Sequence, residues 1–264
     1  MALEDGVPEK KAAGQPRLVV NQPGHYCPGC QYGIMTRLLA EAIEELDIED
    51  DVIGVSAVGC SIMTHIFLDI DFIDALHGRA PEVASGIKLA HFGKKIVFTL
   101  QGDGDLAAIG MGDFINAINR GEILTTIFLN NANYGTTGGQ MAPTTIIGQR
   151  STTTPLGRDP GREGYPVHIA ELVTSLKGLV YSARCSMHTY RNVIQTKKAI
   201  KKAFRCQMEG LGYGFVEVLS ACPSGWKMSP VQSLEWIEKE MIREYPLGVF
   251  KDETQETAES KAED

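Results

Sequence analysis

Residues 95–140 read KIVFTLQGDGDLAAIGMGDFINAINRGEILTTIFLNNANYGTTGGQ, and this stretch decides the fold of the chain. It begins with an apolar run rich in β-branched residues, which predicts a buried strand, and a Gly-Asp-Gly turn follows. An amphipathic segment then predicts a helix, and a second apolar run predicts a buried strand that ends at Asn130. The stretch therefore forms one strand–helix–strand unit, which is the building block of a parallel sheet.

Small polar residues follow both strands of this unit. Asp103 comes directly after the first strand and Asn131 after the second. Because the carboxyl ends of parallel strands face one ligand crevice, we expect these two side chains to converge. Carboxylate, carboxamide and main-chain carbonyl oxygens suit a hard cation, and Mg²⁺ usually also takes oxygens from a phosphorylated ligand. The spacing therefore predicts a clamp for a metal ion and a diphosphate.

Each half of this pattern also has an ordinary explanation, because Gly, Asp and Asn dominate turns in general. A lone Gly-Asp-Gly would be a weak signal. Here it is followed by Asn-Asn, after the residues from Asp105 to Leu129, within the same strand–helix–strand unit. That combination resembles the thiamine diphosphate (TPP) motif, and it stands in the structural context that the motif requires. We therefore favour the cofactor-binding interpretation.

The composition is that of an ordinary globular protein. With 264 residues, 43% of them hydrophobic and 22% charged, the chain can bury a large core as one α/β domain with or without an appendage. Its net charge of -8 argues against a nucleic-acid-binding surface, and no basic stripe interleaved with aromatic residues offsets that charge. The basic run KKAIKKAFR at 197–205 is interpreted as one solvated helix face or a partner contact.

The sequence also indicates where the protein works. No apolar run approaches the roughly 20 residues that a membrane span requires, and the N-terminus has no signal-peptide core. We therefore expect a cytoplasmic protein that does not bind membranes. Six cysteines are too few for a disulfide scaffold in a chain of this length, so metal ligation, catalysis or simple burial are the roles to consider.

The elements alternate between helix and strand along the chain, which predicts an α/β fold with a mostly parallel sheet and helices on both faces. Residues 1–16 are expected to form a flexible arm, residues 17–250 the cofactor-binding domain, and the acidic residues 251–264 a disordered tail. The predicted helices are 32–45, 82–91, 106–117, 169–176, 190–208 and 232–242, and the predicted strands are 52–57, 95–100, 124–129, 179–183 and 214–219.

One connection is much longer than the others. Residues 134–167 lack periodicity and are rich in Gly, Pro and Thr. A connection of this length in a compact domain is usually functional or packed against another chain. We therefore interpret it as a lid or an interface.

The cysteines suggest a second site. Cys27 and Cys30 form a Cys-Pro-Gly-Cys motif, which alone fits a redox pair, half of a metal site or two unrelated thiols. Cys60 and Cys222 each follow a predicted strand, on the edge where the TPP loops lie. Four thiolates can hold zinc or an iron–sulfur cluster, and spacing alone leaves zinc, a cluster and no metal open. The loop Pro and Gly residues free main-chain N–H groups for cluster sulfurs, which fits iron slightly better.

The two other cysteines have less informative surroundings. Cys185 and Cys206 lie in or beside predicted helices, without Gly or Pro neighbours. Buried or unremarkable thiols explain them well.

With both sets of residues in view, residues 20–250 resemble the TPP-binding β subunit of 2-oxoacid:ferredoxin oxidoreductases. The resemblance is strongest to the branch that acts on branched-chain 2-oxoacids such as 2-ketoisovalerate, or on 2-oxoglutarate. It rests on seven blocks in order: HYCPGC, GVSAVGCS, HGRAPEVASGIKLA, QGDGDLAAIG, FLNNANYGTTGGQMAPTT, EVLSACPSGW and EYPLGVFKD. This chain departs from the family pattern at Gln31, where a Gly or another small polar residue is common, and at Ser224, where Thr is expected.

The resemblance implies a role for individual residues. One 4Fe-4S cluster would be held by Cys27, Cys30, Cys60 and Cys222. Mg²⁺ would be held by Asp103, the Asn131 side chain and the Asn133 carbonyl oxygen. A loop near the cofactor would contain His77, Gly78 and Arg79, and the diphosphate would be surrounded by Gly102, Gly104, Asp105, Tyr134, Thr136, Thr137 and Gly138.

The His-Gly-Arg segment has an alternative explanation as a capped turn before a helix. We favour a role at the site, because the guanidinium group of Arg79 could bind a diphosphate or a 2-oxoacid carboxylate bidentately.

The resemblance also implies an activity and partners. The family decarboxylates a 2-oxoacid oxidatively with coenzyme A to give acyl-CoA, CO₂ and reduced ferredoxin, and we favour a branched-chain substrate over 2-oxoglutarate. The glutamate that activates TPP has no matching context here, so no catalytic residue is expected in this chain and a partner must supply one. Alpha, gamma and ferredoxin-like subunits are the expected partners. The alternatives are a non-redox TPP-dependent decarboxylase or synthase subunit and a zinc-stapled, non-catalytic interaction subunit.

Overall fold

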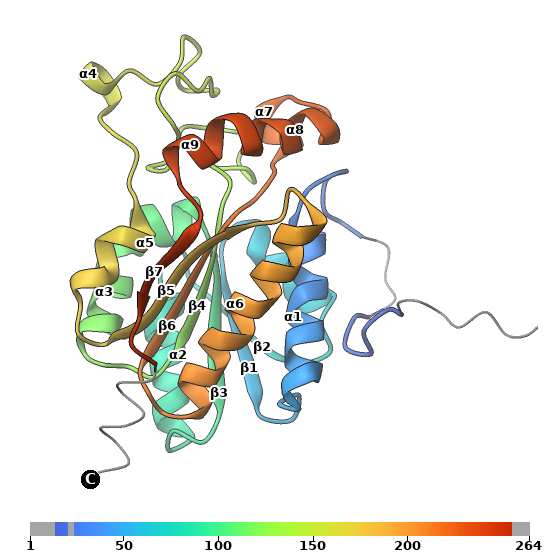
Figure 1. Ribbon diagram of the computed structural model, residues 1–264, viewed down its shortest axis with the longest axis vertical. Helices are drawn as coiled ribbons and strands as arrows, with labels where there is room; N and C mark the ends of the chain where they lie inside the picture. The colour runs from blue at the N-terminus through green and yellow to red at the C-terminus, as the bar shows by residue number, and fades with distance from the viewer. Residues whose placement is uncertain (1–13, 21–23, 255–264) are drawn as a thin grey trace, which may run out of the picture.

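The strand–helix–strand unit of residues 95–140 lies at the centre of the sheet in the computed structural model, which describes residues 14–20 and 24–254 (Figure 1). The described residues form a seven-stranded sheet in the order β2-β1-β3-β4-β6-β5-β7. Every neighbouring pair is parallel except β5 and β7. The mostly parallel sheet is thus confirmed. The strands are β1 (Val52–Ala57), β2 (Asp71–Ala75), β3 (Ile96–Gly102), β4 (Thr125–Asn130), β5 (Leu179–Ser186), β6 (Tyr213–Leu219) and β7 (Gly248–Asp252).

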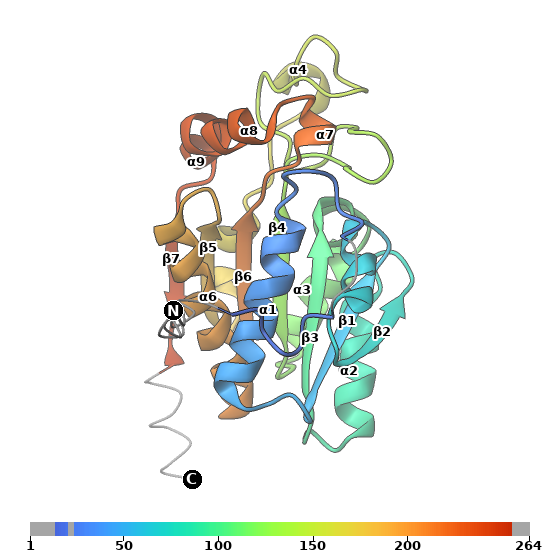
Figure 2. The same cartoon turned by 90° about the vertical axis from the view of Figure 1, so that its right-hand side faces the viewer.

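Helices cover both faces of the sheet, as the alternating pattern predicts (Figures 1 and 2). On one face, α1 (Tyr32–Leu46) and α6 (Tyr190–Met208) pack in one apolar cluster. On the other face, a second cluster contains the apolar residues of α2 (Ala80–Ala90), α3 (Met111–Asn119) and α5 (Ile169–Leu172).

The central strands show why the sheet has two buried faces. Ile96, Phe98 and Leu100 of β3 belong to the cluster under α1 and α6, whereas Val97 belongs to the opposite cluster. Successive side chains of a strand point to opposite faces, so a strand buried on both sides must be apolar without alternation. This explains the continuous apolar runs in the sequence.

The predicted helix at 106–117 begins differently from expectation. A π-helical turn, η2 (Asp105–Ile109), precedes α3, with Gly110 between them. A Cβ atom on Gly110 would lie 2.3 Å from the Asp105 carbonyl oxygen and 2.8 Å from the Gly78 carbonyl oxygen. Only glycine therefore fits between this turn and the loop before α2. Single π turns inside helices occur frequently at functional sites, and this one starts two residues after Asp103.

Both edge strands were missed by the sequence pattern. β2 has mostly exposed side chains and two aspartates in five residues, which are rare in buried strands. β7 is an antiparallel edge strand that contains Lys251 and Asp252. The prediction of a disordered tail from residue 251 was therefore wrong for these two residues. The rest of the predicted tail from residue 255 and the predicted arm at 1–13 lie outside the described residues.

A third layer covers the carboxyl edge of the sheet (Figure 2). It has its own apolar cluster, which includes Ala132, Ile146, Trp226 and Tyr245. Its elements are α4 (Pro160–Glu163), α7 (Pro223–Trp226), α8 (Pro230–Trp236), η4 (Ile237–Met241) and α9 (Ile242–Glu244). The other short helical turns are η1 (Cys60–Ile66) and η3 (Val173–Ser175). None of the helices in the described ranges is long and apolar enough to cross a membrane.

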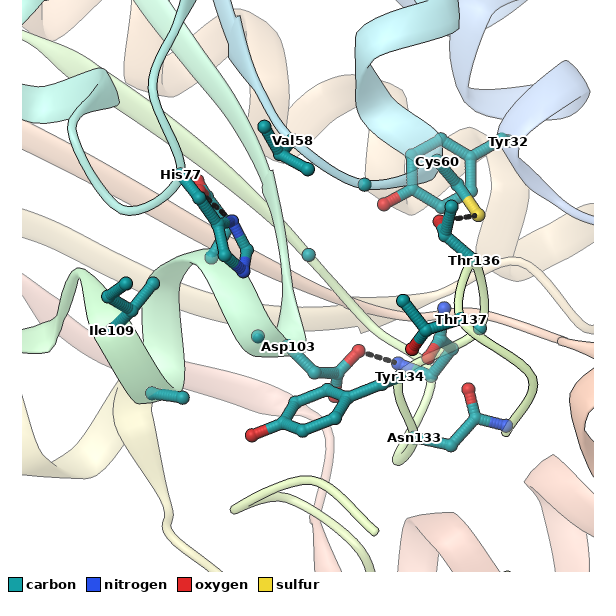
Figure 3. A pocket seen from close by; sticks show the side chains of 17 residues that line it. Tyr32, Val58, Cys60, His77, Asp103, Ile109, Asn133, Tyr134, Thr136 and Thr137 are labelled. Atoms are coloured by element: carbon teal, nitrogen blue, oxygen red, sulfur yellow. Dashed lines mark hydrogen bonds and ion pairs between the residues drawn. The ribbon is translucent and has the colours of Figure 1, made fainter. Parts of the chain in front are cut away.

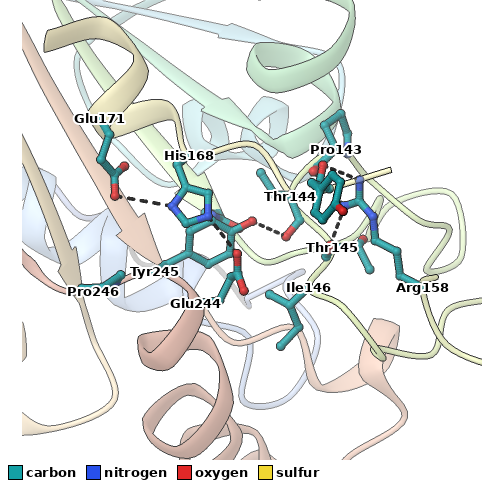
Figure 4. Close-up of polar contacts among 12 residues, drawn as sticks. Pro143, Thr144, Thr145, Ile146, Arg158, His168, Glu171, Glu244, Tyr245 and Pro246 are labelled. Atoms are coloured by element: carbon teal, nitrogen blue, oxygen red, sulfur yellow. Dashed lines mark hydrogen bonds and ion pairs between the residues drawn. The ribbon is translucent and has the colours of Figure 1, made fainter. Parts of the chain in front are cut away.

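Buried hydrogen bonds fold the long connection 134–167 back on itself and tie it to the third layer (Figure 4). The Arg158 side chain is 5% exposed and donates to the carbonyl oxygens of Pro143 at 2.9 Å and Thr145 at 2.5 Å. The Tyr245 hydroxyl donates to the Thr144 carbonyl oxygen at 2.6 Å. The part from 146 to 165, with α4, extends beyond the rest of the fold (Figure 1). Its role as a lid or an interface stays a prediction.

Candidate functional site

A cavity of about 290 Å³ opens at the carboxyl ends of β1, β3 and β4 (Figure 3). The Gly-Asp-Gly turn after β3 and the loop after β4 form opposite parts of its wall. The structure therefore brings most of the predicted cofactor residues together: His77, Gly102, Asp103, Gly104, Asp105, Asn131, Asn133, Tyr134, Thr136 and Thr137 line the cavity, as does Cys60.

Asp103 is the most strongly constrained acid of the cavity. Its carboxylate is 2% exposed and accepts hydrogen bonds from the main-chain N–H groups of Asn131 at 3.0 Å and Ala132 at 3.1 Å. The Thr144 hydroxyl donates a further hydrogen bond. Burial outweighs these bonds and raises the pKa of Asp103 to about 7. A cation beside Asp103 would favour its charged form.

The Asn131 carboxamide completes a cluster of oxygen atoms beside Asp103. One terminal atom of this carboxamide lies 2.8 Å from the Asn133 carbonyl oxygen, 2.9 Å from Asn133 Oδ1 and 2.9 Å from Asp103 Oδ2. If that atom is nitrogen, it donates to all three oxygens. If it is oxygen, it faces the three other oxygens, an arrangement that a cation between them would stabilise. Adjacent ligands of octahedral Mg²⁺, at 2.0–2.1 Å from the ion, lie about 2.9 Å apart, so this donor set fits Mg²⁺.

A residue with left-handed backbone conformation brings Asn131 and Asn133 to Asp103. Ala132 has a φ of 55°, a conformation that costs a residue with a Cβ atom roughly 1–2 kcal/mol. Its N–H group donates to Asn130 Oδ1 at 3.1 Å, and its carbonyl oxygen accepts from Thr145 Oγ1 at 2.7 Å. The neighbouring β-strand anchors Asn130, whose Nδ2 donates to the buried Glu217 Oε1 at 2.7 Å. The turn therefore holds Asn131 and Asn133 against Asp103.

His77 and Asp105 form a second polar pair at the cavity. His77 Nδ1 lies 3.0 Å from Asp105 Oδ1, which also accepts from the Gly78 N–H group at 2.6 Å. Gln101 Nε2 donates to the other carboxylate oxygen at 2.6 Å. Burial raises the pKa of Asp105, and these hydrogen bonds oppose the rise. The imidazole is thereby held at the mouth of the cavity (Figure 3).

Three predicted cofactor residues do not line the cavity: Gly78, Arg79 and Gly138. The guanidinium group of Arg79 contacts Asp113, and it lies 3.2 Å from Glu82 at the start of α2. Both carboxylates raise the pKa of Arg79. In this arrangement Arg79 is paired outside the cavity, so its proposed contact with an oxyanion would require both ion pairs to open.

The cavity has walls that sequence reasoning missed: Tyr32, Val58, Gly59, Ala108, Ile109 and Gly135. Tyr32 is fully buried and stacks on Tyr26, with ring centroids 5.5 Å apart. A Cβ atom on Gly102 would lie 3.2 Å from the Tyr32 hydroxyl, so the glycine makes room for this ring. Val58 and Ile109 are exposed apolar walls. The sequence carries no signal that distinguishes an apolar cavity wall from any other apolar residue next to a strand or in a helix.

The four candidate cysteine ligands share one neighbourhood beside the cavity. A Cβ atom on Gly135 would lie 3.2 Å from Cys222 Sγ and 3.8 Å from Cys60 Sγ, so these two sulfurs flank one glycine. Cys30 follows Cys27 in a tight turn, in which the Cys30 N–H group donates to the Cys27 carbonyl oxygen at 2.9 Å. Burial raises the pKa of Cys30 to about 12, and the negative charges of Cys222, Cys60 and Cys27 add to the rise.

This arrangement differs from that of a single-ion site. Among residues 14–20 and 24–254, no three His, Cys, Asp or Glu side chains meet closely enough to share one metal ion. A structural zinc ion needs four ligands within about 2.3 Å of one point. The thiolates of a 4Fe-4S cluster bind different iron atoms and therefore stand further apart. Cys27, Cys30, Cys60 and Cys222 therefore do not form a closed single-ion site among the described residues.

Main-chain groups also support sulfur ligands here. The main chain of Gly225 lowers the pKa of Cys222 and that of Tyr32 lowers the pKa of Cys30, each against the larger rise that burial causes. Main-chain hydrogen bonds to sulfur stabilise thiolates and are a standard feature around cluster ligands.

We expect Gly225→Ala to disrupt this region, because a Cβ atom there would lie 2.3 Å from Asn133 Nδ2 and 2.8 Å from Cys222 Sγ. Overpacking of this kind costs about 1–3 kcal/mol and displaces both side chains. Iron content and visible absorbance after anaerobic reconstitution should fall. The matched control is Gly33→Ala in α1, where an added Cβ atom meets nothing within 4 Å. Equal iron content in both variants would contradict the prediction.

The remaining cysteines lie away from this neighbourhood. Cys206 is buried in α6, and Cys185 lies in β5 rather than in or beside a helix, because this strand runs three residues beyond its predicted end. Burial raises the pKa of each thiol to about 12. Neither lines the cavity, which agrees with their interpretation as unremarkable thiols.

The fold and the cavity define a cofactor-binding domain, and comparison with known proteins identifies the class. Residues 57–218 match the family described as thiamine pyrophosphate enzyme, C-terminal TPP binding domain. A solved 2-oxoglutarate:ferredoxin oxidoreductase from Magnetococcus marinus superimposes with a TM-score of 0.72, covering 97% of this chain and 92% of that chain. At 22% identity, this likeness shows a shared fold.

Curated relatives place the chain more narrowly. The 2-oxoglutarate synthase subunit KorB of Methanocaldococcus jannaschii is 35% identical over 245 residues, which cover 90% of this chain and 85% of that protein. The ketoisovalerate oxidoreductase subunit VorA of Methanothermobacter marburgensis is 43% identical over 233 residues, or 88% of this chain. The chain spans about half of that relative, 48% of its length. The chain therefore belongs to the TPP-binding subunits of 2-oxoacid:ferredoxin oxidoreductases, and the predicted family is confirmed.

Proposed function

We propose that this chain is the TPP-, Mg²⁺- and 4Fe-4S-binding subunit of a complex that oxidatively decarboxylates a 2-oxoacid with coenzyme A to acyl-CoA, CO₂ and reduced ferredoxin. The observation that carries this proposal is one short loop, residues 131–136. Asn131 and Asn133 belong to the oxygen cluster at Asp103, and Thr136 contacts Cys60. A non-redox TPP subunit would need the first arrangement but not the second.

Asp103, the Asn131 side chain and the Asn133 carbonyl oxygen are the residues that would hold Mg²⁺, which in turn would bind the diphosphate of TPP. Gly102 and Gly104 leave the adjacent wall without side chains. When bound, TPP supplies the electron sink for decarboxylation of a 2-oxoacid. The protein contributes binding and orientation at this end of the cavity.

The His77 and Asp105 pair can hold a proton at a defined atom. An ionised Asp105 accepts from the His77 Nδ1–H group at 3.0 Å and fixes the orientation of the ring. His77 Nε2 lies on the side of Gly104, where a Cβ atom would be 3.5 Å away. This nitrogen is therefore placed to donate to an oxyanion at the mouth of the cavity when the ring is protonated.

The glutamate that activates TPP is proposed to come from a partner subunit. Among the described residues that line the cavity, none is a glutamate. Alpha, gamma and ferredoxin-like subunits are the proposed partners, with ferredoxin as the electron acceptor. A TPP site shared between two chains would make the isolated subunit inactive even when it is fully loaded.

The four cysteines are proposed to hold the cluster that accepts single electrons from the cofactor site. Cys60 lines the cavity itself, so a cluster bound there would lie next to TPP. A zinc-stapled subunit is less consistent with the spread of the four thiols.

A branched-chain 2-oxoacid such as 2-ketoisovalerate is the proposed substrate. The cavity has apolar walls at Val58 and Ile109, and no Lys or Arg side chain is among the described residues that line it. A second carboxylate, as in 2-oxoglutarate, would enter a cavity in which the described lining offers it no Lys or Arg side chain. The relative named for ketoisovalerate is also more similar to this chain than the relative named for 2-oxoglutarate.

A panel of 2-oxoacids assayed on the intact complex, with coenzyme A and a viologen acceptor, tests this proposal. We expect 2-ketoisovalerate to exceed 2-oxoglutarate in kcat/KM by at least about 10-fold, since apolar pockets discriminate by this order. Preference for 2-oxoglutarate would overturn the substrate assignment. Decarboxylation by the isolated, loaded chain at the rate of the complex would overturn the partner glutamate.

A further inference from the structure

We propose that Thr136 and Asn133 donate hydrogen bonds to the sulfurs of Cys60 and Cys222, and that they thereby couple the Mg²⁺-diphosphate clamp to the reduction potential of the cluster. This inference rests on the proposed function. It assigns two side chains of the cofactor loop as positioning residues for electron transfer, in addition to the loop's contacts in the oxygen cluster.

The Thr136 contact is direct. Its Oγ1 atom lies 3.0 Å from Cys60 Sγ (Figure 3). A thiol and a hydroxyl could donate in either direction. A cysteine that ligates iron is a thiolate, which has no proton and can only accept. In the loaded protein the Thr136 hydroxyl is therefore the donor to the Cys60 sulfur.

The Asn133 side chain lies between the two sites. It is 3% exposed, and its Oδ1 atom lies 2.9 Å from the Asn131 carboxamide in the oxygen cluster. Its Nδ2 atom is buried and has no hydrogen-bonding partner of ordinary geometry among the described residues. A buried amide nitrogen without a partner is rare and requires an explanation.

The Cys222 sulfur supplies that explanation. A Cβ atom on Gly225 would lie 2.3 Å from Asn133 Nδ2 and 2.8 Å from Cys222 Sγ, so the two atoms flank the same glycine. The carboxamide thus has its oxygen on the metal side and its nitrogen on the sulfur side.

Internal hydrogen bonds tie the two ends of the segment 134–140 together. The Tyr134 N–H group donates to the Gln140 carbonyl oxygen at 3.0 Å, and the Gly139 N–H group donates back to the Tyr134 carbonyl oxygen at 2.9 Å. Thr137 Oγ1 donates to Gln140 Oε1 at 2.6 Å. Because only Tyr134 and Gly135 separate Asn133 from Thr136, a ligand that moves the main chain at Asn133 would also act on Thr136.

Hydrogen bonds to the sulfurs are one of the determinants of a cluster's reduction potential. Reduction adds one electron, and a donor at a thiolate stabilises the more negative state. Each donor therefore makes the potential less negative. If binding of TPP and Mg²⁺ strengthens or weakens these bonds, the potential must shift with it. By linkage, reduction of the cluster must then change the affinity for TPP and Mg²⁺ by the same factor.

The test is a potentiometric titration of the cluster in the reconstituted complex, followed by electron paramagnetic resonance, with and without TPP and Mg²⁺. Thr136→Val removes the hydroxyl and nearly keeps the volume, and Asn133→Leu removes the amide donor. We expect both variants to have a more negative potential than the wild type. Thr136→Ser keeps the hydroxyl and should restore the wild-type value. In Thr136→Val, the shift caused by TPP and Mg²⁺ should become smaller.

Unchanged potentials in Thr136→Val and Asn133→Leu, with the cluster and TPP both bound, would overturn the inference and leave the proposed function standing. So would a wild-type potential that does not respond to TPP and Mg²⁺. A second readout uses no turnover: TPP affinity measured by calorimetry in the oxidised and the reduced complex should differ in the wild type, and equal affinities would contradict the coupling. A wild-type complex without any cluster would overturn the proposed function itself.

Discussion

Asp103→Asn is expected to abolish Mg²⁺-dependent binding of TPP. The substitution removes the negative charge from the oxygen cluster that Asp103 forms with Asn131 and Asn133. It also places an amide where the main-chain N–H groups of Asn131 and Ala132 and the Thr144 hydroxyl now donate to a carboxylate. Since loss of an outer-sphere partner alone weakens metal binding about 10–100-fold, loss of a charged ligand should weaken it by more than about 100-fold.

Calorimetric titration with TPP at saturating Mg²⁺ measures this effect. Asp50→Asn is the matched control, because Asp50 is exposed and precedes β1 at the opposite edge of the sheet. It makes the same chemical change and should leave TPP affinity unchanged. Wild-type affinity in Asp103→Asn, or an equal loss in both variants, would show that the oxygen cluster does not bind the metal.

Cys60→Ser and Cys222→Ser are expected to eliminate the iron–sulfur cluster. These residues are two of the four proposed thiolate ligands, and their sulfurs flank Gly135 in the cofactor loop. Serine is a poor ligand for cluster iron at neutral pH, since its hydroxyl stays protonated. The brown absorbance that bleaches on reduction should therefore be lost, while the far-ultraviolet circular dichroism of the fold is kept.

Cys206→Ala provides the control for this pair of variants. Cys206 is buried in α6, away from the cavity, and its loss should leave the iron content unchanged. Stoichiometric zinc with no visible absorbance in the wild-type protein would contradict the cluster, because zinc has a filled d shell and is colourless. Full iron content in Cys60→Ser would contradict the ligand assignment.

The central strand–helix–strand unit and the polar residues after its strands could be predicted from the sequence, because residues close together in the chain mark each of them. Continuous apolar runs fix β3 and β4 as strands buried on both faces, and a parallel sheet must bring their carboxyl ends together. Asp103 and Asn131 therefore had to meet at one edge. The cysteines after β1 and β6 could be placed at this edge by the same argument.

Other features depend on contacts between distant residues and leave no local pattern. In the sequence Ala132 looks like an ordinary residue. Its left-handed conformation depends on the hydrogen bonds that its N–H group donates to Asn130 and Asp103 and on the one that its carbonyl oxygen accepts from Thr145. Arg79 has a guanidinium group that could bind an oxyanion, but in the structure this group forms an ion pair with Asp113. The acidic edge strand β2 has no apolar run, because Ala75 alone of its five side chains is fully buried.

The most direct test of this account is whether the substrate reduces the cluster held by this chain. The anaerobic complex is mixed with 2-ketoisovalerate and coenzyme A, frozen within one turnover and examined by electron paramagnetic resonance. We expect the wild-type complex to show the signal of a reduced 4Fe-4S cluster. Complexes that carry Asp103→Asn or Cys60→Ser should not show it. Substrate-dependent reduction of the same signal in the Cys60→Ser complex would contradict this account, because the electrons would then leave the cofactor without a cluster in this chain.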